Sequence, residues 1–143
     1  MPILNYTTEI DVHRTVGEVQ GCLARAGAMA VSVDYGADAQ PEAIMFLVRV
    51  RDVPVSFRLP SRFQGVYKRL CDDPGVPRRF KTENQARQVA WRIVKDWVQA
   101  QMAIIEAGQA ELAEVFLPYA VTESGKTLYQ IFEADQKLLQ AGS

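Results

Sequence analysis

Residues 82–107 constrain the fold more than any other part of this sequence, because apolar side chains recur there at helical spacing along two neighbouring stripes. The first stripe holds Ala86, Ala90, Ile93, Trp97, Ala100 and Ile104, and the second holds Trp91, Val94, Val98, Met102 and Ile105. A helix with so wide an apolar arc must be covered on two sides. We therefore expect this helix to be the centre of the domain or to form an interface between identical subunits.

Capping residues indicate where helices begin and end. Gln85 completes a capping box at the start of the long helix, and Gly108 marks its end. Similar patterns predict further helices over residues 16–26, 62–70, 109–117 and 127–139. The expected N-terminal caps of the first, second and long helices are Thr15, Ser61 and Thr82.

Segments rich in β-forming residues predict four strands, over residues 3–10, 28–35, 43–51 and 55–59. The last two form a hairpin about Asp52-Val53-Pro54, because Pro54 cannot donate to a ladder and belongs at a turn or on an edge strand. We expect an α+β fold: a small antiparallel sheet of about four strands in the order β-α-β-β-β, followed by the long helix and C-terminal helices. The chain has no internal repeat or linker, so residues 1–143 are expected to form one domain.

The sequence lacks the usual machinery of catalysis. His13 is the only histidine, and no pattern places it beside a nucleophile. Cys22 and Cys71 have no other ligand at the spacing that zinc sites use. The segment 124–127 (SGKT) resembles the end of a phosphate-binding P-loop, but Ala120 stands where that motif requires glycine. We expect a protein that is not an enzyme and that needs no metal or cofactor.

Two cysteines in a chain of this size fit a reduced, cytoplasmic protein. No segment approaches the roughly 20 consecutive apolar residues that a membrane span requires. We therefore expect a cytoplasmic protein with no membrane partner.

The charge is strongly polarised along the chain, although the net charge is only −1. Residues 49–95 hold twelve of the sixteen Lys and Arg residues and four acids, a balance of +8. The rest holds four bases and thirteen acids, a balance of −9. Such a basic span is either an anion-binding site, a solvated face, or a surface that the acidic C-terminal part covers within the fold or across a dimer.

The basic span suggests a specific anion site. Residues 78–81 (RRFK) lead into the N-terminus of the long helix, where unpaired N–H groups and the helix dipole favour an anion. Arginine offers a planar fork that matches phosphate, and an aromatic ring offers a stacking face. The period of two places Arg49 and Arg51 on one face of the hairpin, with Arg58 joining them across the turn. The predicted ligand-binding residues are Arg58, Arg78, Arg79, Phe80, Lys81, Arg92 and Lys95.

Most of the chain resembles a known group of proteins in its amino-acid sequence, although in no catalytic motif. The segments ILNYTT (3–8), VPRRFKT (76–82), QARQVAWRIVKDWVQAQ (85–101) and IEAGQAELAEVFLPYAV (105–121) resemble a widespread group of small proteins carried by phages and prophages. Small phage proteins of this size often counter host defence, and the Thoeris anti-defence proteins among them sequester nucleotide-derived immune signals in basic pockets between subunits. The resemblance thus implies a homo-oligomeric sponge in the host cytoplasm. It carries no binding motif that maps onto individual residues here.

Three functions follow as hypotheses. The first is a non-catalytic binding protein for a phosphorylated small molecule or nucleotide, forming a homo-oligomer through the helix at 82–107. The second is a nucleic-acid-binding accessory or nuclease-blocking protein that uses the same basic span. The third is a protein inhibitor of a host defence enzyme, acting through the acidic C-terminal helices.

Overall fold

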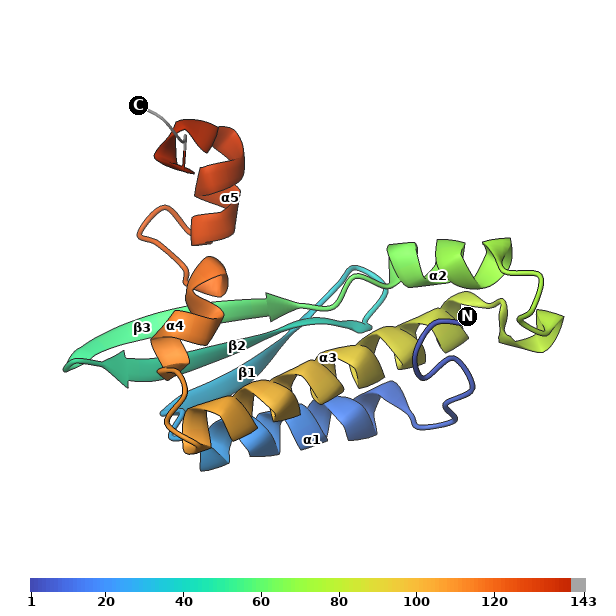
Figure 1. Ribbon diagram of the computed structural model, residues 1–143, viewed down its shortest axis with the longest axis horizontal. Helices are drawn as coiled ribbons and strands as arrows, with labels where there is room; N and C mark the ends of the chain where they lie inside the picture. Colours follow the sequence, from blue (N-terminus) through green and yellow to red (C-terminus); the bar gives the residue numbers. More distant parts are fainter. Residues whose placement is uncertain (140–143) are drawn as a thin grey trace.

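The computed structural model describes residues 1–139 and confirms the α+β class (Figure 1). Its helices are α1 (Val12–Arg25), α2 (Phe63–Asp72), α3 (Glu83–Glu106), α4 (Leu112–Phe116) and α5 (Leu128–Ala134). Its strands are β1 (Ala30–Tyr35), β2 (Pro41–Val50) and β3 (Val53–Pro60). Three 3₁₀ turns are η1 (Arg78–Phe80), η2 (Leu117–Tyr119) and η3 (Gln136–Leu139).

The strands form one antiparallel sheet in the order β1-β2-β3. The predicted hairpin is confirmed, but its turn lies at Arg51 and Asp52, with Val50 paired to Val53. Both turn residues have positive φ, 50° and 67°, which is the backbone of a two-residue turn that follows the twist of the strands. Pro54 is therefore inside β3, which is an edge strand where its missing N–H does no harm.

The predicted strand at 3–10 is wrong, so the sheet has three strands rather than about four. This segment folds into turns, with the Tyr6 amide bonded to the Ile3 carbonyl and Asn5 at a φ of 66°. The side chains of Ile3 and Tyr6 pack on a small cluster beside α2, where Leu70 is fully buried. Tertiary packing of these β-forming residues therefore replaced strand pairing.

Aromatic stacking builds the main core between the sheet and the helices. Phe46 of β2 and Phe57 of β3 stack at a centroid distance of 5.1 Å, and Phe116 of α4 meets the Phe46 ring edge-on at 5.5 Å. Trp97 of α3 adds an edge contact to Phe116 at 5.4 Å. The rings of four elements thus form one continuous cluster, to which α1 contributes Val16, Val19 and Leu23 among other residues.

The helix α3 is the centre of the fold, one of the two roles expected for it. In Figure 1 it runs beside α1 along the sheet, while α2 lies along its N-terminal half. Val98 and Met102 belong to the main core, whereas Ala86 belongs to the smaller cluster with Leu70 and Val76. An interface between copies of the chain through this helix stays a prediction. None of the helices within residues 1–139 combines the length and the apolar character that crossing a membrane demands.

The helix ends agree with the sequence in part. Thr82 caps α3 by accepting a hydrogen bond from the Gln85 backbone amide at 3.1 Å, and Gly108 follows its end at a φ of 72°, as predicted. The capping box predicted for Gln85 is wrong, because its side chain bonds to the N-terminal segment instead of the N-cap. The first helix begins earlier than expected because Asp11, rather than Thr15, is its cap. Thr15 is instead fully buried inside α1.

Two other predicted helices are corrected as well. Ser61 does not cap α2, because its amide extends the sheet by bonding to the Glu42 carbonyl, and Arg62 takes the N-cap position. The C-terminal helices are shorter than predicted. The one expected at 109–117 starts only at Leu112, after the Glu111 capping box, and the one expected at 127–139 gives way after Ala134 to a 3₁₀ turn.

Gln85 pins the N-terminal segment to α3, because its Nε2 donates to the carbonyls of Tyr6 and Thr8 at 2.8 and 2.9 Å. We expect Gln85→Ala to lower the free energy of unfolding by about 1–2 kcal/mol, the sum of two net hydrogen bonds. Amide hydrogen exchange in residues 5–10 should accelerate. Gln99→Ala, at an exposed position of the same helix, is the control and should leave both quantities unchanged. Unaltered exchange in Gln85→Ala would show that the segment is held by its apolar contacts alone.

Candidate anion-binding site

The seven predicted ligand-binding residues fall into three separate places. Residues 78–81 lie in and after η1, beyond the C-terminal end of α2. Arg92 and Lys95 lie on α3, and Arg58 lies on β3. Since Arg92 is nine residues inside α3, it is displaced from the start of that helix by about 14 Å along the axis.

The residues around η1 keep their charge exposed but lose their stacking face. Phe80 is half-buried, with the Tyr6 ring edge-on at 5.7 Å and the Arg79 guanidinium 4.6 Å from its centroid. Arg78 and Arg79 are exposed and Lys81 is half-buried. Within residues 1–139 none of the three forms an ion pair with a carboxylate closer than 4.0 Å. The Phe80 ring is thus a packing element, and the cations remain available.

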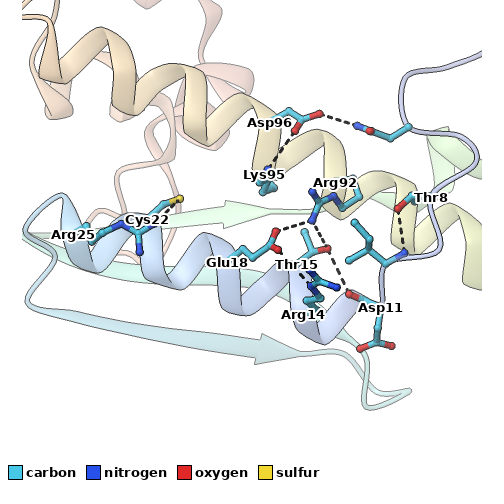
Figure 2. A network of polar contacts seen from close by, with 12 residues as sticks. Thr8, Asp11, Arg14, Thr15, Glu18, Cys22, Arg25, Arg92, Lys95 and Asp96 are labelled. Atoms are coloured by element: carbon cyan, nitrogen blue, oxygen red, sulfur yellow. Dashed lines mark hydrogen bonds and ion pairs between the residues drawn. The ribbon is translucent and has the colours of Figure 1, made fainter.

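Arg92 is used inside the protein, as Figure 2 shows. Its Nη1 lies 2.6 Å from Glu18 Oε2 and donates to Thr15 Oγ1 at 3.3 Å, so that it joins α3 to α1. Only 13% of its side chain is exposed. Glu18 also lies 3.6 Å from Arg14. The charge of Arg92 therefore stabilises the packing of two helices.

Lys95 belongs to a second group of polar contacts on α3, drawn in the same view (Figure 2). Its Nζ is 3.9 Å from Asp96 Oδ1, and only 15% of its side chain is exposed. The other oxygen of Asp96 accepts a hydrogen bond from Asn5 Nδ2 at 2.8 Å. This network fastens the N-terminal segment to α3.

The arginines of the hairpin do not form a cluster, although the register places Arg49 and Arg58 on the same face of the sheet. Arg51 lies in the turn, outside the alternation of the strands, and Arg49 donates to the Asp52 carbonyl at 3.3 Å. Arg49 pairs with Pro54 in the register, so Arg58 lies four residues farther along β3, about 13 Å away along the strand. Arg58 instead lies at the opposite end of the sheet from the turn.

At that end of the sheet the structure forms a hollow of about 700 Å³, which we call the arginine hollow. Its wall comes from the β1–β2 loop, the end of β3, the start of α2, one face of α3 and one residue of α5. The side chains that give it chemical character are Asp38, Gln40, Glu42, Arg58, Arg62, Phe63, Gln64, Arg87, Trp91 and Gln130. This volume is typical of a site for a small molecule.

Arg87 is the most firmly positioned cation of the arginine hollow. Its guanidinium lies 3.9 Å from the centroid of the Phe63 ring, and its Nη2 is 2.6 Å from Asp38 Oδ2. The Gln40 amide, and then Arg87, hold the pKa of Asp38 below its ordinary value of 3.8. Asp38 is therefore ionised at neutral pH, and its pair with Arg87 is lost only in acid.

The other two arginines retain more hydrogen-bonding capacity. The Nε of Arg58 donates a hydrogen bond to Asp34 Oδ2 at 3.3 Å, and within the described residues its terminal Nη groups donate to no protein acceptor. Arg62, the N-cap residue of α2, is exposed, and its side chain has no hydrogen bond or ion pair to the described part of the chain. Since a guanidinium carries five donors, both residues can bind an incoming anion.

Two carboxylates share the wall with these cations and limit its positive charge. A Cβ atom at Gly36 would lie 3.1 Å from Asp38 Oδ1 and 3.3 Å from Glu42 Oε1. Glycine at this position therefore leaves room for both carboxylates at the mouth of the β1–β2 loop. The lining thus holds three cations and two anions.

Sequence reasoning placed Arg58 in the site but missed Arg62, Arg87 and Phe63. All were visible, the arginines as part of the +8 span and Phe63 as part of an apolar helix face. The signal that could have singled out Arg62 and Phe63 is their position directly after β3, at a junction of strand and helix. Arg87 offers no such signal, because its partner Asp38 is 49 residues away.

No group of three or more metal-ligating side chains occurs within the part of the chain that the structure describes. The three guanidinium groups in the wall of the arginine hollow suit the binding of an anion. Comparisons of the chain with protein-family models, with curated proteins and with solved structures found no match.

The position of Arg92 predicts a structural rather than a ligand-binding effect of its removal. We expect Arg92→Gln to lower the free energy of unfolding by about 1–3 kcal/mol, because the partly buried Glu18 loses its nearer cation and keeps only the more exposed Arg14. Denaturant unfolding measures this, and the double variant with Glu18→Gln should lose less than the sum of the single variants. Strictly additive losses would contradict the coupling of the two side chains.

Proposed function

We propose that this chain is a non-catalytic binding protein that sequesters a phosphorylated small molecule, held in the arginine hollow. The observation that carries the proposal is the presence of Arg58, Arg62 and Arg87, from three different elements, in the wall of one hollow of about 700 Å³. The resemblance to phage-encoded anti-defence proteins makes nucleotide-derived signals of host immunity the first ligands to test.

The energetics are sufficient for useful affinity. A hydrogen bond to a charged group contributes roughly 1.5–3 kcal/mol net, and micromolar binding requires about 8 kcal/mol. Two or three guanidinium–phosphate contacts, together with ring contacts, reach this range. Arg87 is already held by Phe63 and Asp38, so little conformational entropy is lost when it engages a ligand.

The direct test is calorimetric titration of the protein with linear and cyclic nucleotides, sugar phosphates and inorganic pyrophosphate. We expect at least one phosphorylated ligand to bind with a dissociation constant on the order of micromolar. Arg62→Gln should weaken its binding about 10-fold or more, because a charge-assisted contact is lost. Arg79→Gln, the same change at an exposed arginine outside the hollow, is the control and should bind normally. No heat with any of these ligands at millimolar concentration would overturn the proposal.

The exposed cations around η1 support nucleic-acid binding as a second candidate function. Arg78, Arg79 and Lys81 lie close together in sequence, and in the described chain none of them forms an ion pair with a carboxylate within 4.0 Å. If these three contact phosphates of duplex DNA, the slope of log affinity against log salt should be about −2.7. Fluorescence anisotropy at several salt concentrations measures it, and Arg78→Gln should reduce the slope by about 0.9. Arg62→Gln is the control here and should leave the slope unchanged. An affinity for DNA that does not depend on the salt concentration would exclude this function.

A further inference from the structure

A second, smaller hollow adjoins the arginine hollow and differs from it in chemistry. It has a volume of about 180 Å³ and lies between the end of β3 and residues 118–130. We call it the tyrosine slot, because Tyr119 and Tyr129 line it together with Pro60 and Pro118. Arg58, Pro60, Arg62 and Gln130 line both hollows, so the two spaces meet at these residues.

The slot has one wall fixed by the core. The ring centroids of Tyr119 and Trp97 are 5.8 Å apart, with an angle of 69° between the ring planes. The centroid of Trp97 is 5.4 Å from that of the buried Phe116. Tyr119 is thus held through a chain of aromatic contacts that begins in the main core. Such a preset ring offers a ligand contact area at low entropic cost.

The other wall belongs to α5, which stands off the sheet in Figure 1. Its attachment is nevertheless defined, because the Val121 amide bonds to the Ser56 carbonyl at 2.8 Å and the Leu128 amide to the Ala120 carbonyl at 2.9 Å. Tyr129 is 49% exposed on this helix. A large half-exposed ring beside a slot is available for a partner ring.

Gln130 adds a directed polar group where the slot meets the hollow. Its Oε1 accepts the Thr127 amide at 2.9 Å in the capping box of α5. The amide nitrogen of Gln130 is therefore left as a donor, and within the described residues it donates to no protein acceptor. A ring carbonyl or ring nitrogen is the acceptor that suits it.

We infer that the tyrosine slot binds a heteroaromatic ring of the same ligand whose phosphate lies in the arginine hollow, so that the ligand class is a nucleotide. This inference rests on the proposed function. The volume of the slot is close to the roughly 150 Å³ of an engineered apolar cavity that holds one benzene molecule. Arg58 and Arg62, which line both spaces, set the position of the phosphate nearest the ring.

The test uses calorimetry to compare the affinities of three ligands for the protein. These are a nucleotide that the protein binds, the ribose phosphate that lacks the heteroaromatic ring of that nucleotide, and inorganic pyrophosphate. We expect the ring to strengthen binding about 5- to 150-fold, the range of a base stacked on an aromatic side chain. Tyr129→Ala should remove this advantage and leave the binding of the ringless phosphates unchanged. Tyr129→Phe, which keeps the ring, should bind as the original chain does, and circular dichroism checks that both variants fold.

The outcomes separate the two proposals. Equal affinity for ringed and ringless ligands, with no effect of Tyr129→Ala, overturns the tyrosine slot and leaves the phosphate site standing. Binding of no phosphorylated compound overturns the proposed function and the slot with it. A ring advantage that persists in Tyr129→Ala places the ring elsewhere and also overturns the slot.

Discussion

The need to cover α3 on two sides determines where the candidate site forms. The sheet and α1 cover one apolar stripe, and α2 covers the N-terminal half of the other. To do so, α2 must run antiparallel to α3 from the end of β3, which brings Phe63 against Arg87. The β1–β2 loop reaches the same place through Asp38. The arginine hollow therefore arises at the point where strand, helix and loop meet because the central helix had to be buried.

In the described residues, the basic excess of residues 49–95 is reduced by acids from outside that span: Asp96 directly after it, and three acids from the N-terminal part of the chain. Glu18, Asp34 and Asp38 pair with Arg92, Arg58 and Arg87. Exposed pairs of this kind contribute little stability, about 0–1 kcal/mol, whereas the less exposed Arg92 pair contributes more. Within the described residues, the C-terminal carboxylates Glu106, Glu123 and Glu133 form no ion pair with the basic span.

Local patterns predicted the elements whose stability is local. The caps and the apolar period of α3 depend on neighbours within a few residues, and the hairpin of β2 and β3 depends on a two-residue turn. The strand prediction at 3–10 failed because it rested on the β preference of residues such as Ile3, Tyr6 and Thr8. This preference is weaker than the apolar packing and the Gln85 hydrogen bonds that hold these residues in turns.

The membership of the site was only partly predictable for the same physical reason. The clustering of cations along the sequence predicted that seven residues share one site. Residues such as Arg79 and Arg92, however, are separated in space because Arg92 lies inside the rigid helix α3 and Arg79 lies before it. Arg58, Arg62 and Arg87, in contrast, come together only through the packing of α2 on α3. A charge count along the chain detects how many cations exist, whereas tertiary packing decides which of them share a hollow.

The mixture of charges in the arginine hollow favours a small ligand with both charged and neutral groups over a simple polyanion. Asp38 and Glu42 lie at the mouth of the β1–β2 loop, where they repel an extended phosphate backbone. Carboxylates accept hydrogen bonds from hydroxyl groups, and guanidinium groups bind phosphate. A sugar phosphate presents both kinds of group a few ångströms apart, which a run of phosphates alone does not. If the arginine hollow binds such a ligand, as proposed, the acidic side chains supply selectivity at the expense of part of the electrostatic attraction that three arginines would otherwise exert.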